Sequence, residues 1–398
     1  MNYRRAVAYL EGFQKMGIRL GLDRIKTLLS HLGDPQENYK MIHIAGTNGK
    51  GSVAAMLSSI LNQSGYRVGL YTSPHLVDYI ERIRINEKDV SRDKFAEAVE
   101  KVKRAIDKLP EMDLTEFEVL TAAAFLFFAR EGMEIVIVET GLGGRLDATN
   151  VITPILSIIT NIERDHMDVL GGTINSIAKE KGGIIKNRVP LVTGEQKVWK
   201  VFQKVCKEKK SPFIRSNREK VKFSPFQGAH QRENTKTVIA SVKVLRGLGI
   251  RIADAQMDKG LRKAYWPGRL QIVSKKPLMI LDGAHNPAGA KALAGYLAGL
   301  KKKFVFVFGM QRNKDIDSVI KILLPVADRF IVVKSGNPNA VSKEVLAKKI
   351  GRAGGRAVIV KNLKDAMAIA KKTGSPVCVA GSLYLVGDVL KDMRGKGG

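Results

Sequence analysis

Cysteine is scarce in this chain of 398 residues, which contains only Cys206 and Cys378. The two residues lie far apart and match no spacing of a metal site or a redox pair. A disulfide-stapled secreted fold and a cysteine-based zinc site are therefore not expected. We expect two reduced thiols, either buried or on the surface, in a cytoplasmic protein.

Long hydrophobic runs are also missing. No stretch reaches the roughly 18 apolar residues of a membrane helix, and residues 1–10 carry two arginines with no apolar segment behind them. The sequence therefore predicts no membrane span, no secretory signal and no membrane partner. Aromatic residues make up 6% and hydrophobic residues 44% of the chain. This composition is typical of a globular protein, and the length suggests two or three domains.

Acidic residues are outnumbered, because 67 lysines and arginines face 38 aspartates and glutamates, for a formal net charge of +29. About half of the excess lies in residues 271–398, with 23 basic and 8 acidic residues. Such a field attracts anions, whether nucleotide phosphates, polycarboxylates or nucleic acid. The basic runs are short, as in residues 301–303, and lack interleaved aromatic residues. A nucleic-acid partner is therefore disfavoured.

Short β-branched runs alternate with amphipathic stretches in two series, which predicts an α/β fold with mostly parallel sheets. The runs lie at 41–45, 68–71, 135–138 and 155–159, and then at 278–281, 304–308, 330–333, 357–360 and 377–380. Breaker and polar residues between the two series favour a linker within residues 265–277, and we set its bounds at residues 269–277. We therefore expect a larger α/β domain over residues 1–268, a smaller α/β domain over residues 278–398, and a cleft.

A glycine-rich loop follows the first run and precedes a helical stretch. It consists of Gly46, Thr47, Asn48, Gly49, Lys50, Gly51 and Ser52. Glycines let backbone N–H groups surround phosphate oxygens, and the helix N-terminus adds positive charge. Lys50 can then reach the β- and γ-phosphates, and Ser52 a phosphate or Mg²⁺. Only two residues separate Gly46 from the Gly-Lys pair, so the loop is a shortened phosphate-loop variant; a plain glycine-rich turn is the alternative.

Potential ligands for a hard cation follow three other predicted strands. Ser73, Glu139 and His166 stand where an open α/β sheet places its ligand crevice. Each also has an ordinary explanation, as a turn residue, a solvated strand end, and a capping or core residue. Their common position beside a phosphate loop favours a metal site. Lys181 by itself indicates only a solvated helical lysine.

Taken together, the motifs resemble the folylpolyglutamate synthase and dihydrofolate synthase family of the Mur ligase superfamily. They occur in family order from residue 20 to residue 388, and they include 46–52, 71–76, 139–150, 165–166, 180–181, 228–231 with Asn234, 266–269, 281–287 and 381–385. The resemblance implies a Mur-ligase architecture, in which a P-loop ATPase-type domain carries a smaller Rossmann-like domain. It also implies that domain closure completes the site.

The resemblance assigns nucleotide and metal roles residue by residue. The residues implied to hold ATP are Gly46, Thr47, Asn48, Gly49, Lys50, Gly51, Ser52, Asn234, Arg269, Asp282 and His285. The residues implied at two Mg²⁺ sites are Ser52, Ser73, Glu139, His166 and Lys181, with Lys181 carbamylated. The implied catalytic set is Lys50, Glu139, His166, Lys181 and His285.

The implied pterin pocket is formed by Leu20, Gly21, Leu22, Phe117, Leu146, Asp147 and Ala148. One residue beside it departs from the family pattern, because Glu116 stands where an aromatic residue is common. The resemblance does not separate an enzyme that uses both acceptors from one that uses folates alone.

The implied reaction is ATP-dependent ligation of L-glutamate to reduced folates, and also to 7,8-dihydropteroate, through an acyl phosphate with release of ADP and phosphate. We expect a monomer that needs no nucleic acid. The rival within the superfamily is a cell-wall ligase, but only 45 residues precede Gly46, too few for the UDP-binding domain of those enzymes. The rival from another class is a basic, nucleotide-dependent nucleic-acid-binding protein.

Overall fold

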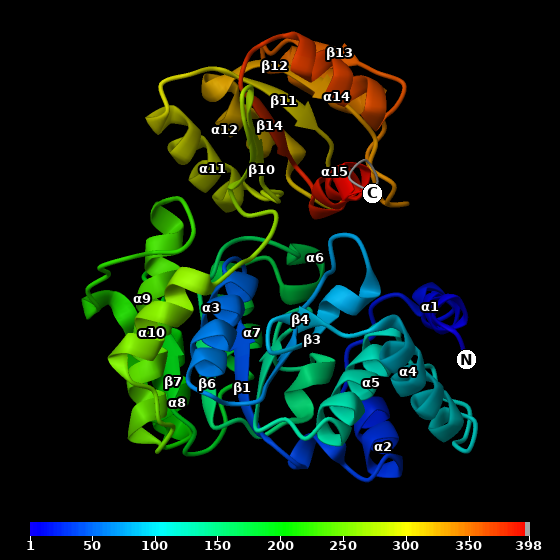
Figure 1. The fold of residues 1–398 in the computed structure, drawn as a ribbon, viewed down its shortest axis with the longest axis vertical. Helices are drawn as coiled ribbons and strands as arrows, with labels where there is room; N and C mark the ends of the chain where they lie inside the picture. The colour runs from blue at the N-terminus through cyan, green and yellow to red at the C-terminus, as the bar shows by residue number, and fades with distance from the viewer. Residues whose placement is uncertain (395–398) are drawn as a thin grey trace. The chain divides into compact units, whose positions relative to one another are not determined.

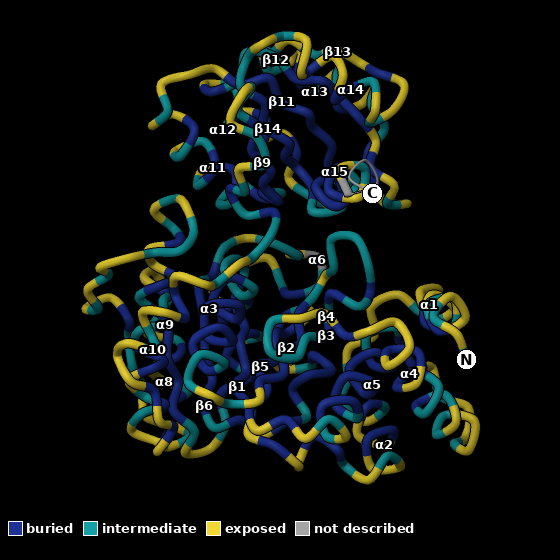
Figure 2. The backbone as a smooth tube through the Cα atoms, viewed as in Figure 1, coloured by how far each residue is buried: buried dark blue, intermediate teal, exposed yellow. Residues whose placement is uncertain are grey.

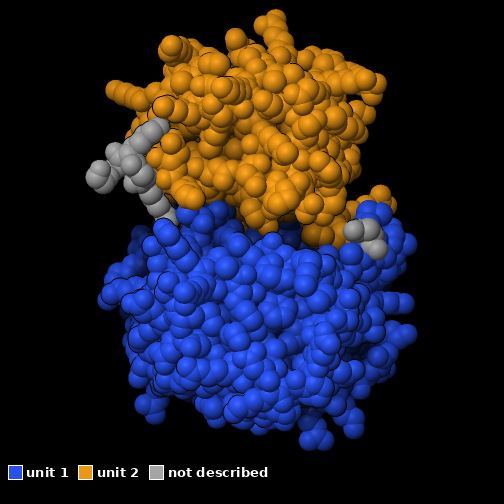
Figure 3. Space-filling view, turned by 90° about the vertical axis from the view of Figure 1, so that its right-hand side faces the viewer, with its two compact units in different colours: residues 1–163, 167–225, 233–265 blue, residues 164–166, 226–232, 266–398 orange. Residues whose placement is uncertain are grey.

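The computed structural model describes residues 1–394 and divides into two compact units, which Figure 3 draws in different colours. Unit 1 comprises residues 1–163, 167–225 and 233–265. Unit 2 comprises residues 164–166, 226–232 and the chain from residue 266 onward. Two short segments, 164–166 and 226–232, therefore belong to unit 2 although unit 1 flanks them in the sequence.

Unit 1 is built on an eight-stranded sheet with the order β4-β3-β2-β5-β1-β6-β7-β8 (Figure 1). The strands are β1 (Lys40–Ala45), β2 (Val68–Tyr71), β3 (Ile83–Ile85), β4 (Lys88–Asp89), β5 (Ile135–Glu139), β6 (Leu156–Ile159), β7 (Leu191–Thr193) and β8 (Phe213–Arg215). Neighbouring strands are parallel except in the β2–β3 and β3–β4 pairs. The central strands β1, β5 and β6 are buried except for Lys40 (Figure 2), because helices cover a sheet of this kind.

The helices of unit 1 come from both halves of its sequence. They are α1 (Tyr3–Glu11), α2 (Asp23–His31), α3 (Lys50–Gln63), α4 (Arg92–Ile106), α5 (Glu116–Arg130), α6 (Met167–Leu170), α7 (Ile174–Gly182), α8 (Trp199–Glu208), α10 (Asp254–Lys263), and α9 (Ala229–Gly247) from residue 233. Short 3₁₀ helices lie at Gln14–Met16, Pro35–Glu37, Tyr79–Arg82, Ala148–Val151 (η4) and Ser216–Arg218.

Local sequence explains where α5 begins. The side chain of Thr115 accepts the backbone N–H of Glu118, and the Glu118 carboxylate accepts the Thr115 N–H, so α5 starts in a capping box. The helix then buries an almost continuous apolar run that includes Phe125 and Phe128. This packing fixes the first turn of α5 against the sheet, and with it Phe117.

Unit 2 has a six-stranded sheet with the order β13-β12-β11-β14-β10-β9. Its strands are β9 (Gln271–Lys275), β10 (Leu278–Leu281), β11 (Phe304–Phe308), β12 (Ala327–Val332), β13 (Ala357–Ile359) and β14 (Val377–Ala380). Its helices are α11 (Pro287–Gly299), α12 (Ile316–Leu323), α13 (Lys343–Arg352), α14 (Leu363–Lys372) and α15 (Leu383–Arg394), with a 3₁₀ helix at Leu324–Val326. Only the β9–β10 pair is antiparallel. Stacked Phe306 and Phe330 lie in the core.

The structure confirms two α/β domains with mostly parallel sheets. It differs from the expected linker at residues 269–277, because residues 271–275 form β9. This strand is antiparallel, lies at the sheet edge and has no buried residue, so its sequence lacks the apolar run by which buried strands are recognised. Among residues 1–394, the structure contains no helix with the length and apolar character needed to span a bilayer.

Candidate active site

The glycine-rich loop lies between β1 and α3, as the sequence predicts. Gly49 precedes the first residue of α3 with φ +86°, and Gly46 has φ +147°. A Cβ added to Gly46 would lie 1.8 Å from Thr160 Oγ1, so only glycine fits there without movement. The loop therefore leads directly into the N-terminus of α3. A glycine-rich loop followed by a helix N-terminus is an arrangement that suits phosphate binding.

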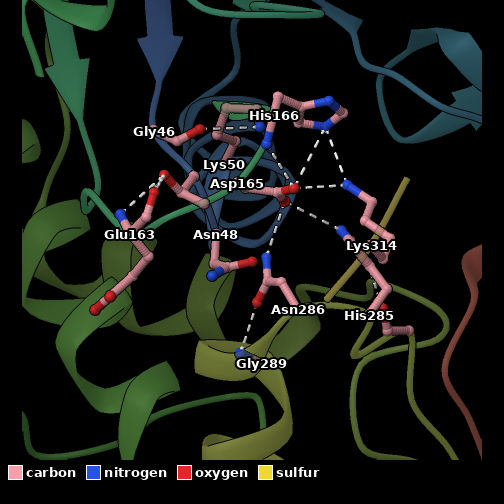
Figure 4. A network of polar contacts seen from close by, with 12 residues as sticks. Gly46, Asn48, Lys50, Glu163, Asp165, His166, His285, Asn286, Gly289 and Lys314 are labelled. Atoms are coloured by element: carbon pink, nitrogen blue, oxygen red, sulfur yellow. Dashed lines mark hydrogen bonds and ion pairs between the residues drawn. The ribbon is translucent and has the colours of Figure 1, made fainter. Parts of the chain in front are cut away.

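The segment after β6 forms hydrogen bonds with this loop, and the sequence did not predict these contacts. The Asn48 N–H donates to Asn161 Oδ1 at 2.9 Å, and Thr160 Oγ1 donates to the Asn48 carbonyl at 2.7 Å. The Glu163 N–H donates to Thr47 Oγ1 at 3.0 Å (Figure 4). The only sequence signal for these residues is their position directly after a predicted strand.

Two lysines of unit 1 donate to one backbone oxygen. Lys50 Nζ and Lys181 Nζ each lie 3.1 Å from the Gly46 carbonyl oxygen, and Figure 4 shows the Lys50 contact. Lys50 also lies 3.8 Å from Glu139 Oε1. Lys181 is only 5% exposed. The interpretation of Lys181 as a solvated helical lysine is therefore wrong, because its amine is buried at the loop.

Glu139 ends β5 beside the same loop, with Ile44 of β1 as its partner in the sheet register. Its carboxylate is 5% exposed, and Oε2 accepts the Ser73 N–H at 3.4 Å. Ser52 is buried in the first turn of α3. Within residues 1–394 no group of three His, Cys, Asp or Glu side chains could hold a metal. The candidate metal ligands are thus the Glu139 carboxylate and the hydroxyl groups of Ser52 and Ser73. These oxygen groups suit Mg²⁺, because this ion prefers oxygen ligands and keeps several waters.

Asn234, in α9, also lies against the loop. A Cβ added to Gly49 would lie 2.4 Å from Asn234 Oδ1. Asn234 is 8% exposed, and it approaches the loop from a helix 185 residues later in the sequence. Unit 1 therefore brings together the phosphate loop, Ser73, Glu139, Lys181 and Asn234.

In unit 2, four side chains surround the Asp165 carboxylate (Figure 4). Lys314 Nζ donates to Oδ1 at 2.7 Å and Asn286 Nδ2 donates to Oδ2 at 3.0 Å, while His285 Nε2 lies 3.6 Å and His166 Nε2 3.8 Å from the carboxylate. Burial alone would raise the pKa of Asp165, but His285 and Lys314 hold it well below its usual range. The predicted residues His166 and His285 thus meet at a carboxylate, with Lys314 as a partner that the sequence did not indicate.

The remaining predicted nucleotide residues of unit 2 are the buried Asp282 and the half-buried Arg269. Asp282 accepts the N–H groups of Leu270 at 2.8 Å and Ala284 at 2.9 Å. Burial raises the pKa of Asp282, although the charge of Arg269 opposes this. Arg269 Nη1 would lie 2.3 Å from a Cβ at Gly283, so its guanidinium group lies against that glycine.

The predicted pterin residues of α5 and of the loop after β5 lie close together. The Phe117 ring covers Gly141, because a Cβ added there would lie 2.6 Å from the ring. Phe117 also stacks on Tyr71, with ring centroids 6.0 Å apart. Asp147 is buried and accepts the Leu142 N–H at 2.7 Å, so its carboxylate organises its own loop. Leu146 is half-buried and Ala148 buried.

The segment with Leu20, Gly21 and Leu22 is tied to α5 by Arg24. The Arg24 guanidinium donates to Glu118 at 3.1 Å and to the Arg19 carbonyl at 2.7 Å. Leu20 keeps 45% of its surface exposed, so its side chain is accessible to a ligand.

Glu116, the departure from the family pattern, has a partner network of its own. Its Oε1 accepts the Tyr79 hydroxyl at 2.8 Å and lies 3.9 Å from Arg82. Arg82 Nε in turn donates to His75 Nδ1 at 2.9 Å. Glu116 therefore links the start of α5 to the segment that follows Ser73.

Two family models match the chain. The Mur ligase middle domain matches residues 44–246, and the C-terminal domain of dihydrofolate synthetase matches residues 269–392. The first of these covers the phosphate loop, Glu139, Lys181 and Asn234, and the second covers Asp282, His285 and Lys314.

Similar proteins and solved structures cover the chain from end to end. The dihydrofolate synthase/folylpolyglutamate synthase of Bacillus subtilis is 34% identical over 98% of this chain and 99% of its own length. That of Escherichia coli is 33% identical over 98% and 96%. The structure of E. coli FolC in complex with DHPP and ADP has a TM-score of 0.90, 29% identity and coverage of 99% and 98%. The Yersinia pestis bifunctional enzyme complexed with AMPPNP and Mn ion has a TM-score of 0.89 and 31% identity, covering 99% and 98%.

Proposed function

The chain belongs to the dihydrofolate synthase/folylpolyglutamate synthase family of Mur ligases, and from this premise we propose that it ligates L-glutamate both to 7,8-dihydropteroate and to reduced folates. Family membership makes the chain a ligase. The observation that carries the nucleotide part of the proposal is the meeting of Lys50 and Lys181 at the Gly46 carbonyl, next to Glu139.

We propose that the phosphate loop binds ATP, with Lys50 against the β- and γ-phosphates and Asn234 toward the adenine. Lys50 would exchange its bond to the Gly46 carbonyl for a phosphate oxygen, because a charged acceptor gives the stronger hydrogen bond. The backbone N–H groups at the start of α3 add to the positive potential. Arg269, Asp282 and His285 are proposed to contribute further nucleotide contacts from unit 2.

Glu139, Ser73 and Ser52 are proposed to hold one Mg²⁺, and His166 is proposed to serve a second. When bound, Mg²⁺ neutralises phosphate charge as two anions approach each other. Lys181 is proposed to carry a carbamate, which forms when its neutral amine adds to CO₂ and releases one proton. The change would turn a buried cation into an anion that can support the second metal.

In the proposed reaction, a carboxylate oxygen of the acceptor attacks the γ-phosphorus of ATP, and the bond to ADP breaks. The neutral amine of L-glutamate then attacks the acyl carbon, the C–O bond to phosphate breaks, and the nitrogen loses one proton as the amide forms and inorganic phosphate leaves. Lys50 stabilises charge in the first step and remains unmodified. The pterin is proposed to bind at Phe117, with its pocket completed by Leu20, Gly21, Leu22, Leu146, Asp147 and Ala148.

The direct test is ADP formation with Mg²⁺-ATP and L-glutamate, with either 7,8-dihydropteroate or tetrahydrofolate as acceptor, and with products identified by mass. We expect one glutamate to be added to each acceptor. Addition to tetrahydrofolate alone would restrict the proposal to folylpolyglutamate synthesis. ADP release with neither acceptor, but with another carboxylate, would overturn the folate assignment and keep the ligase chemistry.

A further inference from the structure

His43 is a titratable residue inside unit 1 that the proposed mechanism does not use. It lies on β1, three residues before Gly46, and its side chain is fully buried. Its neighbours in the sheet register are Val138 of β5 and Ser157 of β6. Because an unpaired polar group is costly to bury, the ring must find a partner within the protein.

The ring contacts Thr149 of η4, and Thr149 in turn contacts Asp147. His43 Nε2 lies 2.9 Å from Thr149 Oγ1, and Thr149 Oγ1 donates to Asp147 Oδ1. The Thr149 backbone N–H donates to the same carboxylate oxygen at 3.0 Å. All three residues are buried. His43 is therefore one end of a buried hydrogen-bonded chain whose other end is a proposed pterin-pocket residue.

The chemistry of the three side chains sets the direction of donation along this chain. An ionised Asp147 can only accept, so the Thr149 hydroxyl group donates to it and offers its lone pairs to His43. His43 then donates from Nε2 as the neutral Nε2–H tautomer. Its Nδ1 is left as an acceptor, and this buried atom has no hydrogen-bond partner among the described residues. The reverse direction requires a protonated Asp147, which the N–H groups of Leu142 and Thr149 disfavour by donating to its carboxylate.

Asp147 carries the effect of this chain to the loop after β5. Its Oδ2 accepts the Leu142 N–H at 2.7 Å, and the Phe117 ring lies against Gly141, the preceding residue. The position of the carboxylate therefore sets the course of residues 141–147, which bear part of the proposed pterin pocket.

We infer that His43 is a positioning residue for the acceptor substrate, acting through Thr149 to orient the Asp147 carboxylate and the 141–147 loop. The inference rests on the proposed function. The Nε2–H group fixes the Thr149 hydroxyl group with its proton toward Oδ1, and a hydroxyl group that accepts a hydrogen bond donates a stronger one. Without His43, the Thr149 lone pairs lose their donor, and the carboxylate is held less firmly. The expected result is weaker binding of the pterin acceptor with unchanged binding of ATP.

The first test observes the ring itself. The full chain, labelled with ¹⁵N-histidine, contains six histidines, and the His43 signals are those absent from His43→Gln. Two-bond ¹⁵N–¹H correlation spectra at neutral pH identify the protonated nitrogen. We expect a neutral His43 with a slowly exchanging proton on Nε2, and faster exchange of this proton in Thr149→Val. A charged ring, a proton on Nδ1, or unchanged His43 signals in Thr149→Val would overturn the inference.

The second test uses steady-state kinetics with the acceptor varied. His43→Leu removes the donor, and KM for 7,8-dihydropteroate or tetrahydrofolate should rise about five-fold, while kcat and KM for ATP change less than about two-fold. His43→Gln keeps an N–H and should recover most of this rise. The matched control is Ser157→Ala, which breaks a different buried hydrogen bond of the same sheet, from Ser157 Oγ to the Ile184 carbonyl at 2.9 Å. An unchanged acceptor KM in His43→Leu, or an equal rise in Ser157→Ala, would overturn the inference.

A double variant tests whether His43 acts through Thr149. Thr149→Val removes the hydroxyl group that donates directly to Asp147, so the acceptor KM should rise about tenfold. In the double variant H43L/T149V it should rise no further, because the chain is already broken. Independent effects would multiply to about 50-fold and would overturn the inference. Failure of the proposed function is a separate result, namely no ADP release with either acceptor in the unmodified chain, and the NMR test does not depend on it.

Discussion

The two units hold Lys50 and Lys314 in different ways. In unit 1, Lys50 donates to a backbone carbonyl and lies 3.8 Å from the nearest Glu139 oxygen. In unit 2, Lys314 Nζ lies 2.7 Å from Asp165 Oδ1, and the Lys314 side chain is only 5% exposed. A lysine on a neutral acceptor can transfer to a phosphate at little cost, whereas a buried ion pair is lost only at a large cost. Lys50 thus suits a changing ligand, and Lys314 suits a permanent structural partner.

The largest expected effect is the loss of activity on substitution of Lys50, in unit 1. Lys50→Met should lower kcat for ADP formation about 10³-fold, because the charge that stabilises the transferring phosphate is lost. The thermal unfolding temperature should change little, since Lys50 gives up only a carbonyl contact and a long ion pair. Steady-state kinetics and calorimetry measure both quantities. A large loss of stability with normal kcat would reverse the roles we assign to the two lysines.

Lys314→Met should have the opposite signature. Removing the cation leaves the buried Asp165 carboxylate with too little compensating charge, which should destabilise unit 2 by about 3 kcal/mol. Denaturant unfolding followed by hydrogen exchange within unit 2 measures this change. Asp165→Asn combined with Lys314→Met should recover part of the loss, because the uncompensated charge is then gone. A double variant no more stable than Lys314→Met would show that the pair contributes through packing alone.

The phosphate loop offers a sharper test of unit 1. Gly46→Ala introduces a Cβ that collides with Thr160 at a backbone conformation unsuited to alanine, so kcat/KM for ATP should fall about 30-fold. The matched control is Gly295→Ala in α11, where nothing lies within 4 Å of the new Cβ and helix propensity favours alanine. Equal effects of the two substitutions would mean that loop geometry is not what binds the nucleotide.

Acid should act differently on His43 and on Asp165. The folded pKa of His43 is lowered from 6.5 to about 3, so only the unfolded chain takes up its proton between those values. Stability should then fall by about 1.4 kcal/mol per pH unit as the pH drops from 6.5 toward 3. Asp165, whose pKa is also lowered, keeps its contribution until the pH falls below the unfolded value near 3.8.

The variant His43→Gln, which keeps an N–H near Thr149, isolates this proton. Urea unfolding at several pH values gives the slope of the free energy of unfolding against pH. Between pH 6.5 and 3 this slope should correspond to about one proton fewer than in the unmodified chain. An unchanged slope would mean that His43 is protonated in the folded protein.

The smallest expected effect concerns the basic excess in unit 2. If its charge attracts anionic acceptors, KM for a folate with several glutamates should rise a few-fold between about 0.05 M and 0.5 M salt. KM for dihydropteroate, which carries less charge, is the internal control and should rise less. Equal salt dependence of the two values would remove a role in acceptor binding from the basic excess.

The sequence was most informative where one short segment determines the geometry. The phosphate loop follows an apolar strand directly and has glycines where positive φ angles occur, so residues 46–52 could be recognised by inspection. The Asp165–Lys314 pair could not, because 149 residues separate the partners and nothing local marks them as neighbours. Thr160 was missed because its role is a contact with a different loop. The edge strand β9 was missed because it buries no residue, which removes the periodic signal.

The three-residue segment 164–166 has a consequence for how this protein can be divided. Unit 2 looks portable in the sequence, because most of it follows residue 266. A fragment cut there would lack Asp165 and leave the Lys314 ammonium group inside the protein without its carboxylate. Fragment expression, domain exchange with a relative, or circular permutation must therefore carry both residues or replace both. In evolutionary terms, the part of the chain from residue 266 onward is tied to the distant segment 164–166, so the two are expected to be inherited or exchanged together.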